Sequence, residues 1–343
     1  MRTFKLVNKK KFLSFKRKKF DFKSDEALAK VLYSGVCGSD LSVYLGHHPY
    51  KKAPTVLGHE FLGKITNKGS KISKIKKNDL VTTLSYNFCN KCNNCKSGLT
   101  NHCNYKTIPS YKNWDGTFAD FFLCKKNSIY KLKKNIHRLD AVMMEPFAIC
   151  NHAINLVPSK KINNTLILGA GNMGLATLML TKITKRFSKI GCVDLFNSRK
   201  KFVKKLKGDY FIKYSRKNLI NKIPLGIKKK GIDLIFITCD YKNVLEDAFE
   251  IIKPNGTIII ISYFKNKFKI DYNQVVKKEI NLKGSFLSTI KDFREVEKLI
   301  LKKKLAPRKI ISHIYPFKKI QHAFNQMNVN RKKNLKIIFK NER

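Results

Sequence analysis

A glycine-rich turn after an apolar strand constrains the fold of this 343-residue chain more than any other feature. Residues 166–168 (LIL) lead directly into residues 169–174 (GAGNMG), where Asn172 opens a predicted helix. In such a G-x-G-x-x-G turn the glycines let the backbone approach a dinucleotide pyrophosphate, which the helix N-terminus holds. An acidic side chain ends the next predicted strand, where it accepts hydrogen bonds from the adenosine ribose diol. The predicted cofactor-binding residues are Gly169, Gly171, Gly174 and Asp194.

Two residues of the second strand and its helix bear on the choice of cofactor. The carboxylate of Asp194 repels a 2′-phosphate, so it favours NAD over NADP. Arg199 either contacts the adenosine or is a solvated helix residue, and an arginine here leaves room for NADP. The alternative to a dinucleotide site is a tight strand-to-helix turn that needs its glycines only for packing.

The strand and helix patterns change along the chain. Short strands between Gly, Pro, Asn and Asp turns are predicted in residues 1–156, for example at 3–8, 29–33, 61–66 and 79–83. From residue 164 onward, β-branched strands alternate with helices, which is typical of a doubly wound parallel sheet. We predict an α/β protein with a β-rich domain (1–156), a Rossmann domain (157–290) and a C-terminal segment (291–343) that returns to the first domain.

Four cysteines with the spacing C-x2-C-x2-C-x7-C indicate a metal site: Cys89, Cys92, Cys95 and Cys103. Four thiolates at about 2.3 Å complete a tetrahedral shell around Zn²⁺ and leave no position for a substrate, so the site is predicted to be structural. His102 is interpreted as a surface residue. The cysteines in apolar segments are expected to be buried, namely Cys124, Cys150, Cys192 and Cys239.

The composition is strongly basic, with a net charge of +49, but only ten of its 72 basic residues are arginine. Because base and phosphate readout relies on arginine, we predict salt-sensitive binding to polyanions and no specific nucleic-acid partner. A non-catalytic basic zinc protein that binds nucleic acid is the remote alternative. A positive field would also attract an anionic substrate such as a sugar acid or phosphate.

No apolar run approaches the roughly 20 residues that a membrane helix needs. The lysine-rich start of the chain has no central apolar stretch and therefore does not resemble a secretory signal. We expect a cytoplasmic protein with no membrane partner.

A second set of metal ligands is spread along the chain. Cys37 lies in a Cys-Gly-Ser-Asp run, His59 and Glu60 are adjacent, and Glu145 precedes a proline. A thiolate, an imidazole and a carboxylate can hold a catalytic Zn²⁺ and leave its fourth position open. Taken singly, the cysteine could be a buried residue, the histidine a core residue and the glutamate a turn residue. The presence of all three types in one chain favours a catalytic metal site.

These motifs together resemble the zinc-containing medium-chain dehydrogenase family over essentially the whole chain. The similar elements are residues 37–40 (CGSD), 58–63 (GHEFLG), the four-cysteine loop, 115–118 (DGTF), 145–146 (EP), 169–174 and 283–286 (KGSF). The Glu-Pro pair is similar to that of the sorbitol, L-idonate, galactitol-phosphate and threonine dehydrogenases. The resemblance implies a GroES-like catalytic domain, an oxidoreductase that uses zinc and NAD, and a homo-oligomer, either tetramer or dimer.

The resemblance also implies roles for single residues. Cys37 and His59 would bind the catalytic zinc, with Glu145 as a ligand or as the holder of a ligand water. Glu60 is the alternative ligand. Ser39 would take the substrate proton, and Asp40 would bond the far nitrogen of His59.

Two departures from the family pattern affect the expected chemistry. Ser42 replaces a histidine that passes the proton onward in many relatives, and residues 287–288 (LS) replace an Arg-Tyr pair near the substrate of sorbitol dehydrogenases. His47 and His48 are interpreted as surface residues. We predict hydride transfer from a polyol or sugar acid, similar to L-idonate or sorbitol, to NAD. The alternatives are an L-threonine 3-dehydrogenase-like enzyme and a sugar-alcohol-phosphate dehydrogenase.

Overall fold

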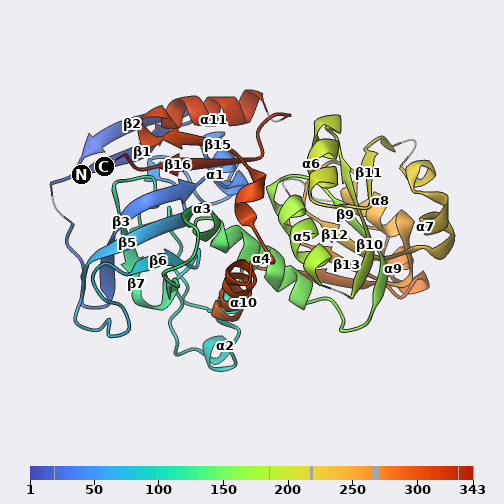
Figure 1. Cartoon of the computed structure of the whole chain (residues 1–343), viewed down its shortest axis with the longest axis horizontal. Helices are drawn as coiled ribbons and strands as arrows, with labels where there is room; N and C mark the ends of the chain where they lie inside the picture. The colour runs from blue at the N-terminus through green and yellow to red at the C-terminus, as the bar shows by residue number, and fades with distance from the viewer. Residues whose placement is uncertain (19, 185, 217–218, 265–269, 331, 343) are drawn as a thin grey trace. The chain divides into compact units, whose positions relative to one another are not determined.

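The computed structural model describes residues 1–343 except 19, 185, 217–218, 265–269, 331 and 343. The chain folds into two compact units, of which one comprises residues 1–148 and 287–343 and the other residues 149–286 (Figure 1). The first unit is β-rich and the second is an α/β unit with a parallel sheet, which agrees with the predicted α/β fold class.

The first unit is built around a large, mostly antiparallel sheet. Among the described residues its strand order is β15-β16-β3-β5-β6-β8, with β7 pairing β3, and a smaller sheet has the order β2-β1-β4. The strands are β1 (Arg2–Asn8), β2 (Lys11–Lys16), β3 (Glu26–Gly35), β4 (Thr55–Val56), β5 (Glu60–Lys68), β6 (Leu80–Thr83), β7 (Phe121–Lys125), β8 (Ile129–Lys131), β15 (Ile311–Pro316) and β16 (Lys336–Lys340). The helices are α1 (Gly38–Tyr44), α2 (Asn93–Lys96), α3 (Arg138–Ala141), α10 (Ile290–Leu301) and α11 (Ile320–Val329). The C-terminal strand β16 therefore lies directly beside β3.

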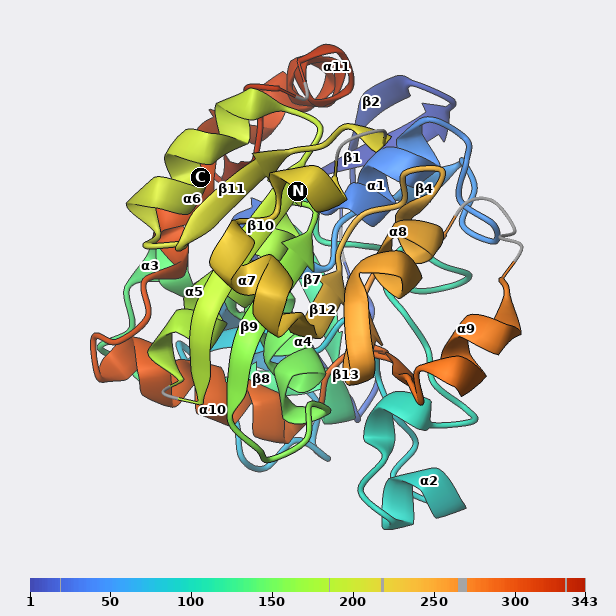
Figure 2. The same ribbon diagram turned by 90° about the vertical axis from the view of Figure 1, so that its right-hand side faces the viewer.

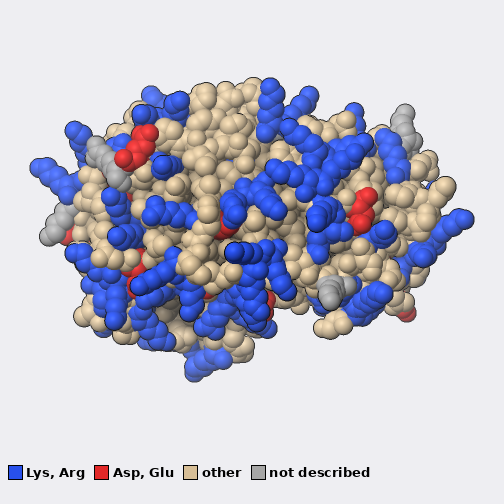
Figure 3. Space-filling model, viewed as in Figure 1, with Lys and Arg blue, Asp and Glu red and all other residues tan. Residues whose placement is uncertain are grey.

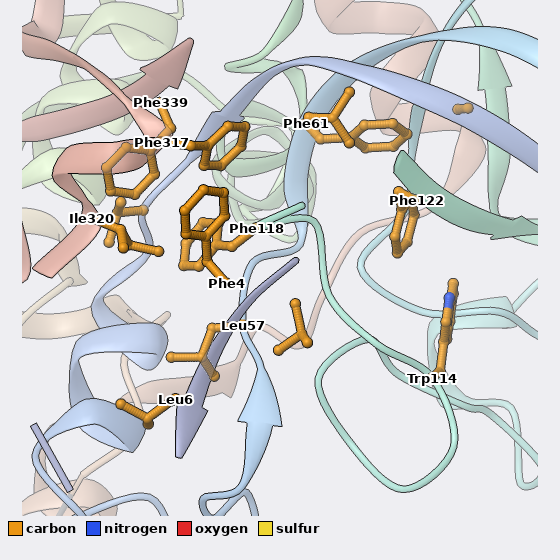
Figure 4. Close-up of a cluster of buried hydrophobic side chains, with 14 of the residues drawn as sticks. Phe4, Leu6, Leu57, Phe61, Trp114, Phe118, Phe122, Phe317, Ile320 and Phe339 are labelled. Carbon is orange, nitrogen blue, oxygen red and sulfur yellow. The ribbon is translucent and has the colours of Figure 1, made fainter. Parts of the chain in front are cut away.

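Aromatic side chains fill the core of this unit (Figure 4). Phe4 on β1 stacks on Phe317 at 5.4 Å between ring centroids, and Phe118 meets Phe339 of β16 edge to face, also at 5.4 Å. Such pairs stabilise a core beyond the burial of their area. The core thus fixes the C-terminal segment of the chain against residues from its N-terminal part.

The second unit contains a parallel sheet in the order β11-β10-β9-β12-β13-β14 within the described residues. Helices α5 and α6 cover one face and α8 the other (Figure 2), so the central strands are apolar on both sides. Its strands are β9 (Ile162–Leu168), β10 (Phe187–Asp194), β11 (Tyr210–Lys213), β12 (Ile232–Ile237), β13 (Ile252–Ile260) and β14 (Asn281–Gly284). Its helices are α5 (Asn172–Ile183), α6 (Lys200–Lys205), α7 (Leu225–Lys230), α8 (Val244–Ile251) and α9 (Tyr272–Lys277), while α4 (Met144–Asn155) begins in the first unit and ends in the second.

Lysine and arginine are by far the most common charged side chains on the face drawn in Figure 3, and few acidic side chains lie among them. No described helix combines the length and the apolar character that crossing a membrane requires.

Candidate active site

The glycine turn of the second unit has the geometry that its sequence predicts. Gly169 has φ +100°, a left-handed conformation that favours glycine. A Cβ on Gly174 would lie 1.8 Å from the carbonyl oxygen of Gly169, so helix α5 could not start this close to the turn with any side chain there. Around Gly171 a Cβ would meet no atom within 4 Å, which leaves that position open to a ligand.

Asp194 closes this turn at the end of β10. Its two carboxylate oxygens accept hydrogen bonds from the backbone N–H of Ala170 at 2.8 Å and of Phe196 at 2.9 Å. Arg199 is only 5% exposed, which excludes the alternative of a solvated helix residue. Burial lowers the pKa of Arg199, and the charge of Asp194 opposes that shift. Asp194 thus holds the turn through two backbone hydrogen bonds, and the buried Arg199 follows it in the next segment.

The four cysteines of the predicted structural site converge in the first unit. Their sulfur atoms all lie within 4.8 Å of one another, with separations of 3.6 Å for Cys92–Cys95, 3.9 Å for Cys89–Cys95 and 4.0 Å for Cys92–Cys103. Four sulfurs bound to one Zn²⁺ at about 2.3 Å with tetrahedral angles would lie about 3.8 Å apart. The observed spacing fits such an ion and is far too long for disulfides, which need about 2.05 Å.

The four thiols differ in how readily they ionise. Backbone N–H donors lower the pKa of Cys92 to about 6, whereas burial and the neighbouring Cys92 raise the pKa of Cys95 to about 12. Four thiolates cannot ionise together without a positive charge among them. His102 is exposed, as predicted, and takes no part in the cluster.

The second predicted ligand set also comes together. Ligand atoms of Cys37, His59 and Glu60 lie within 4.8 Å of one another. Cys37 precedes helix α1 and His59 precedes strand β5, and Asp40 holds these two segments together. Its oxygens accept hydrogen bonds from Cys37 N at 3.0 Å and Gly58 N at 3.2 Å.

Asp40 also faces the imidazole of His59. The distance from Asp40 Oδ1 to His59 Nδ1 is 3.6 Å, and both side chains are buried. Burial alone would lower the pKa of His59, but the charges of Asp40 and Cys37 outweigh it and raise this pKa well above the usual range. A negative neighbour at Nδ1 orients the ring and leaves Nε2 as the atom that can bind a metal.

Glu60 is neutralised by a residue that the sequence did not single out. Its Oε2 forms a buried ion pair with Lys336 of β16, whose Nζ also donates to the carbonyl of Val36 at 3.0 Å. Both side chains are at most 1% exposed. Gly35 of β3 lies opposite Glu60 in the sheet register, and a Cβ there would be 2.1 Å from Glu60 Oε2. The glycine thus provides the space in which the two charges meet.

Glu145 lies outside the trio but close to it. Burial raises the pKa of its carboxyl, His59 opposes the shift and Glu60 adds to it. In the described structure Glu145 Oε1 and Glu60 Oε1 are buried and have no hydrogen-bond partner. Two carboxylates thus offer unsatisfied oxygens near Cys37 and His59, which is the environment that a buried divalent cation would satisfy.

Two lysines near this trio were missed by sequence reasoning. Lys336 is recognisable only as a charged residue in an otherwise apolar strand, and Lys51 carries no local signal in a chain this rich in lysine. His47 is exposed as predicted, whereas His48 is partly buried and its Nδ1 accepts a hydrogen bond from Lys51 N at 3.1 Å.

Comparison with known proteins agrees with this geometry. The family model of the alcohol dehydrogenase GroES-like domain matches residues 23–134, and that of zinc-binding dehydrogenases matches residues 173–302. The D-arabitol-phosphate dehydrogenase of Enterococcus avium is 28% identical, covering 88% of this chain and 87% of its own. The L-galactonate-5-dehydrogenase of Escherichia coli K12 is 25% identical and covers 95% of both chains.

A solved structure shows the same fold. The rspB alcohol dehydrogenase of Escherichia coli CFT073, in complex with NADH, has a TM-score of 0.89 at 24% identity over 99% of both chains. The two family models together span more than half of the sequence. The chain therefore belongs to the zinc-containing medium-chain dehydrogenase family, in its polyol dehydrogenase-like branch.

Proposed function

We propose that this enzyme transfers a hydride from a secondary alcohol of a polyol or sugar acid to NAD. The main support is the convergence of Cys37, His59 and buried carboxylates that have unsatisfied oxygens. The names of two relatives, D-arabitol-phosphate and L-galactonate dehydrogenase, are consistent with a polyol-derived substrate.

The trio fits a catalytic zinc because it offers a thiolate, an imidazole and a carboxylate but no fourth protein ligand in the same cluster of described residues. When bound, zinc would supply a Lewis acid that lowers the pKa of the substrate hydroxyl, and NAD would supply the hydride acceptor. Asp40 keeps His59 oriented for this role. Ser39, half-buried in the first turn of α1, is the proposed first acceptor of the substrate proton.

The test of this function is a substrate panel followed by NADH absorbance. Zinc-loaded protein is incubated with NAD and L-idonate, sorbitol, galactitol 1-phosphate or L-threonine. The proposal expects the highest kcat/KM for a polyol, a sugar acid or a phosphorylated polyol. A clear preference for L-threonine would favour the amino-alcohol alternative, and no turnover with any alcohol would reject the proposal.

The four-cysteine cluster is proposed to hold a second, structural zinc. Replacing Cys103 by serine is expected to lower the zinc content from about two ions per chain to about one, because a neutral hydroxyl is a poor substitute for a thiolate. The midpoint of thermal unfolding should fall as well. Zinc is measured by plasma mass spectrometry, and Cys124→Ser, at a buried thiol outside both clusters, is the matched control that should keep both ions.

Asp194 is proposed to set the preference for NAD. Asp194→Asn should raise KM for NAD about 10- to 100-fold, since hydrogen bonds to charged groups contribute about 1.5–3 kcal/mol. The same change should improve the use of NADP because the repulsion of its 2′-phosphate is lost. Steady-state kinetics with both cofactors measures the effect, and a wild-type enzyme that already prefers NADP would contradict this assignment.

A further inference from the structure

Lys51 is a buried cation in the loop that joins α1 to β4. Its side chain reaches inward, where Nζ donates to the carbonyl oxygen of Pro109 at 2.8 Å, and only 9% of the residue is exposed. Its own backbone N–H donates to His48 Nδ1. Most lysines of this chain, in contrast, extend into solvent (Figure 3). A buried ammonium requires compensation that a solvated one does not.

Hydrogen bonds place Lys51 next to the segment that carries His59. Its Nζ donates to the carbonyl of Pro109, and Oγ of the following residue, Ser110, donates to the carbonyl of Gly58 at 3.5 Å. Burial lowers the pKa of Lys51, while Asp40, Cys37 and Glu145 each oppose that shift. Cys37 belongs to the centre, and Asp40 lies 3.6 Å from the imidazole of His59. The ammonium therefore lies within electrostatic range of the residues proposed to bind metal and substrate.

The nearby carboxylates do not use up the hydrogen-bonding capacity of Lys51. An ammonium has three donors, and the carbonyl of Pro109 is the one hydrogen-bond partner of Nζ among the described residues. Asp40 is held by Cys37 N and Gly58 N, and Glu60 is neutralised by Lys336. Lys51 forms no ion pair with any carboxylate in the described part of the chain. Two donors are thus available beside the site.

We infer that Lys51 binds an anionic group of the substrate, a carboxylate or a phosphate, while the reacting hydroxyl lies at Cys37 and His59. This inference rests on the proposed function and narrows its substrate class to acidic derivatives of polyols. A compact ammonium is well suited to such a group, because charge-assisted hydrogen bonds are stronger than neutral ones. The cation acts on binding and orientation, and it takes no part in the proton or hydride transfer.

Matched substrate pairs test this role. L-idonate and L-iditol differ at a carboxylate, and galactitol 1-phosphate and galactitol differ at a phosphate. The wild-type enzyme should prefer the anionic member of one pair by at least about tenfold in kcat/KM. Lys51→Met should raise KM for that member about 10- to 100-fold, with kcat changed little and with KM for the neutral member unchanged. The pair that responds tells whether the group is a carboxylate or a phosphate.

Lys51→Arg is the conservative variant and should recover most of the lost affinity, because it keeps the charge. If Lys51 only held the loop to Pro109, Lys51→Met would impair both members of each pair equally, and that result would overturn the inference. Equal kcat/KM for both members in the wild type would also overturn it.

Calorimetry of the zinc-loaded protein with NADH gives a second readout that needs no turnover. L-Idonate or galactitol 1-phosphate should bind more weakly to Lys51→Met than to the wild type. If the enzyme oxidised neutral polyols but showed no preference for the anionic substrates, the role of Lys51 would be rejected and the proposed function would stand. Absence of oxidation with all four alcohols would reject the proposed function, and the binding comparison would still decide the role of Lys51.

Discussion

Lys336→Met is expected to lower the free energy of unfolding by about 3–5 kcal/mol, one of the largest effects of any single substitution in this chain. Lys336 and Glu60 are almost completely buried and form an ion pair. In the zinc-free protein, removing Lys336 leaves the carboxylate of Glu60 buried without its ion-pair partner, and solvation cannot replace the lost ammonium. Urea unfolding followed by circular dichroism measures the change, provided that the m-values of the two proteins agree.

The double variant Lys336→Met with Glu60→Gln is the control. It removes both charges, so it should be clearly more stable than Lys336→Met alone. Together with Glu60→Gln alone it completes a double-mutant cycle, which measures the coupling between the two residues. A loss of less than about 1 kcal/mol in the single variant would match a solvent-exposed pair. Such a result would contradict the buried position of β16 beside the site.

His59→Ala or Cys37→Ala is expected to lower kcat by about a thousandfold or more. Loss of a ligand would remove the Lewis acid, which contributes several kcal/mol to the stabilisation of the transition state, and each 1.36 kcal/mol is a factor of about ten in rate. Binding of NADH should be retained, because the glycine turn and Asp194 belong to the other unit. Turnover, zinc content and quenching of NADH fluorescence are the three measurements.

His47→Ala is a matched control for His59→Ala. His47 is exposed and lies in the loop between the two ligand segments, so its loss should leave zinc content and turnover close to those of the wild type. Circular dichroism shows whether each variant is folded. Full activity in zinc-stripped, folded protein would reject the metal-dependent reaction that we propose.

Local sequence patterns predicted the elements whose chemistry is local. The turn at Gly169 and Gly174 is recognisable because steric demands at single backbone positions allow only glycine there. The four-cysteine loop is recognisable because its ligands lie close together in sequence. Strands β1 and β6 begin and end within one residue of the predicted segments 3–8 and 79–83.

Contacts between distant segments were harder to foresee. Glu60 and Lys336 are 276 residues apart, and nothing in either local sequence shows that their side chains meet. The burial of Lys51 could not be predicted either, because it depends on how the loop folds over its neighbours. Residues 37 and 59 were recognisable through their motifs, but the sequence left open which of Glu60 and Glu145 joins them. The structure gathers Glu60 with the pair and keeps Glu145 nearby.

The position of Lys336 on β16 has a consequence for biosynthesis. During translation, Cys37, His59 and Glu60 leave the ribosome long before Lys336, and N-terminal segments generally begin to fold first. Until β16 joins the sheet beside β3, the carboxylate of Glu60 lacks the counter-charge of Lys336. A cation that arrived before β16 docked would therefore meet a more negative environment than the folded chain presents.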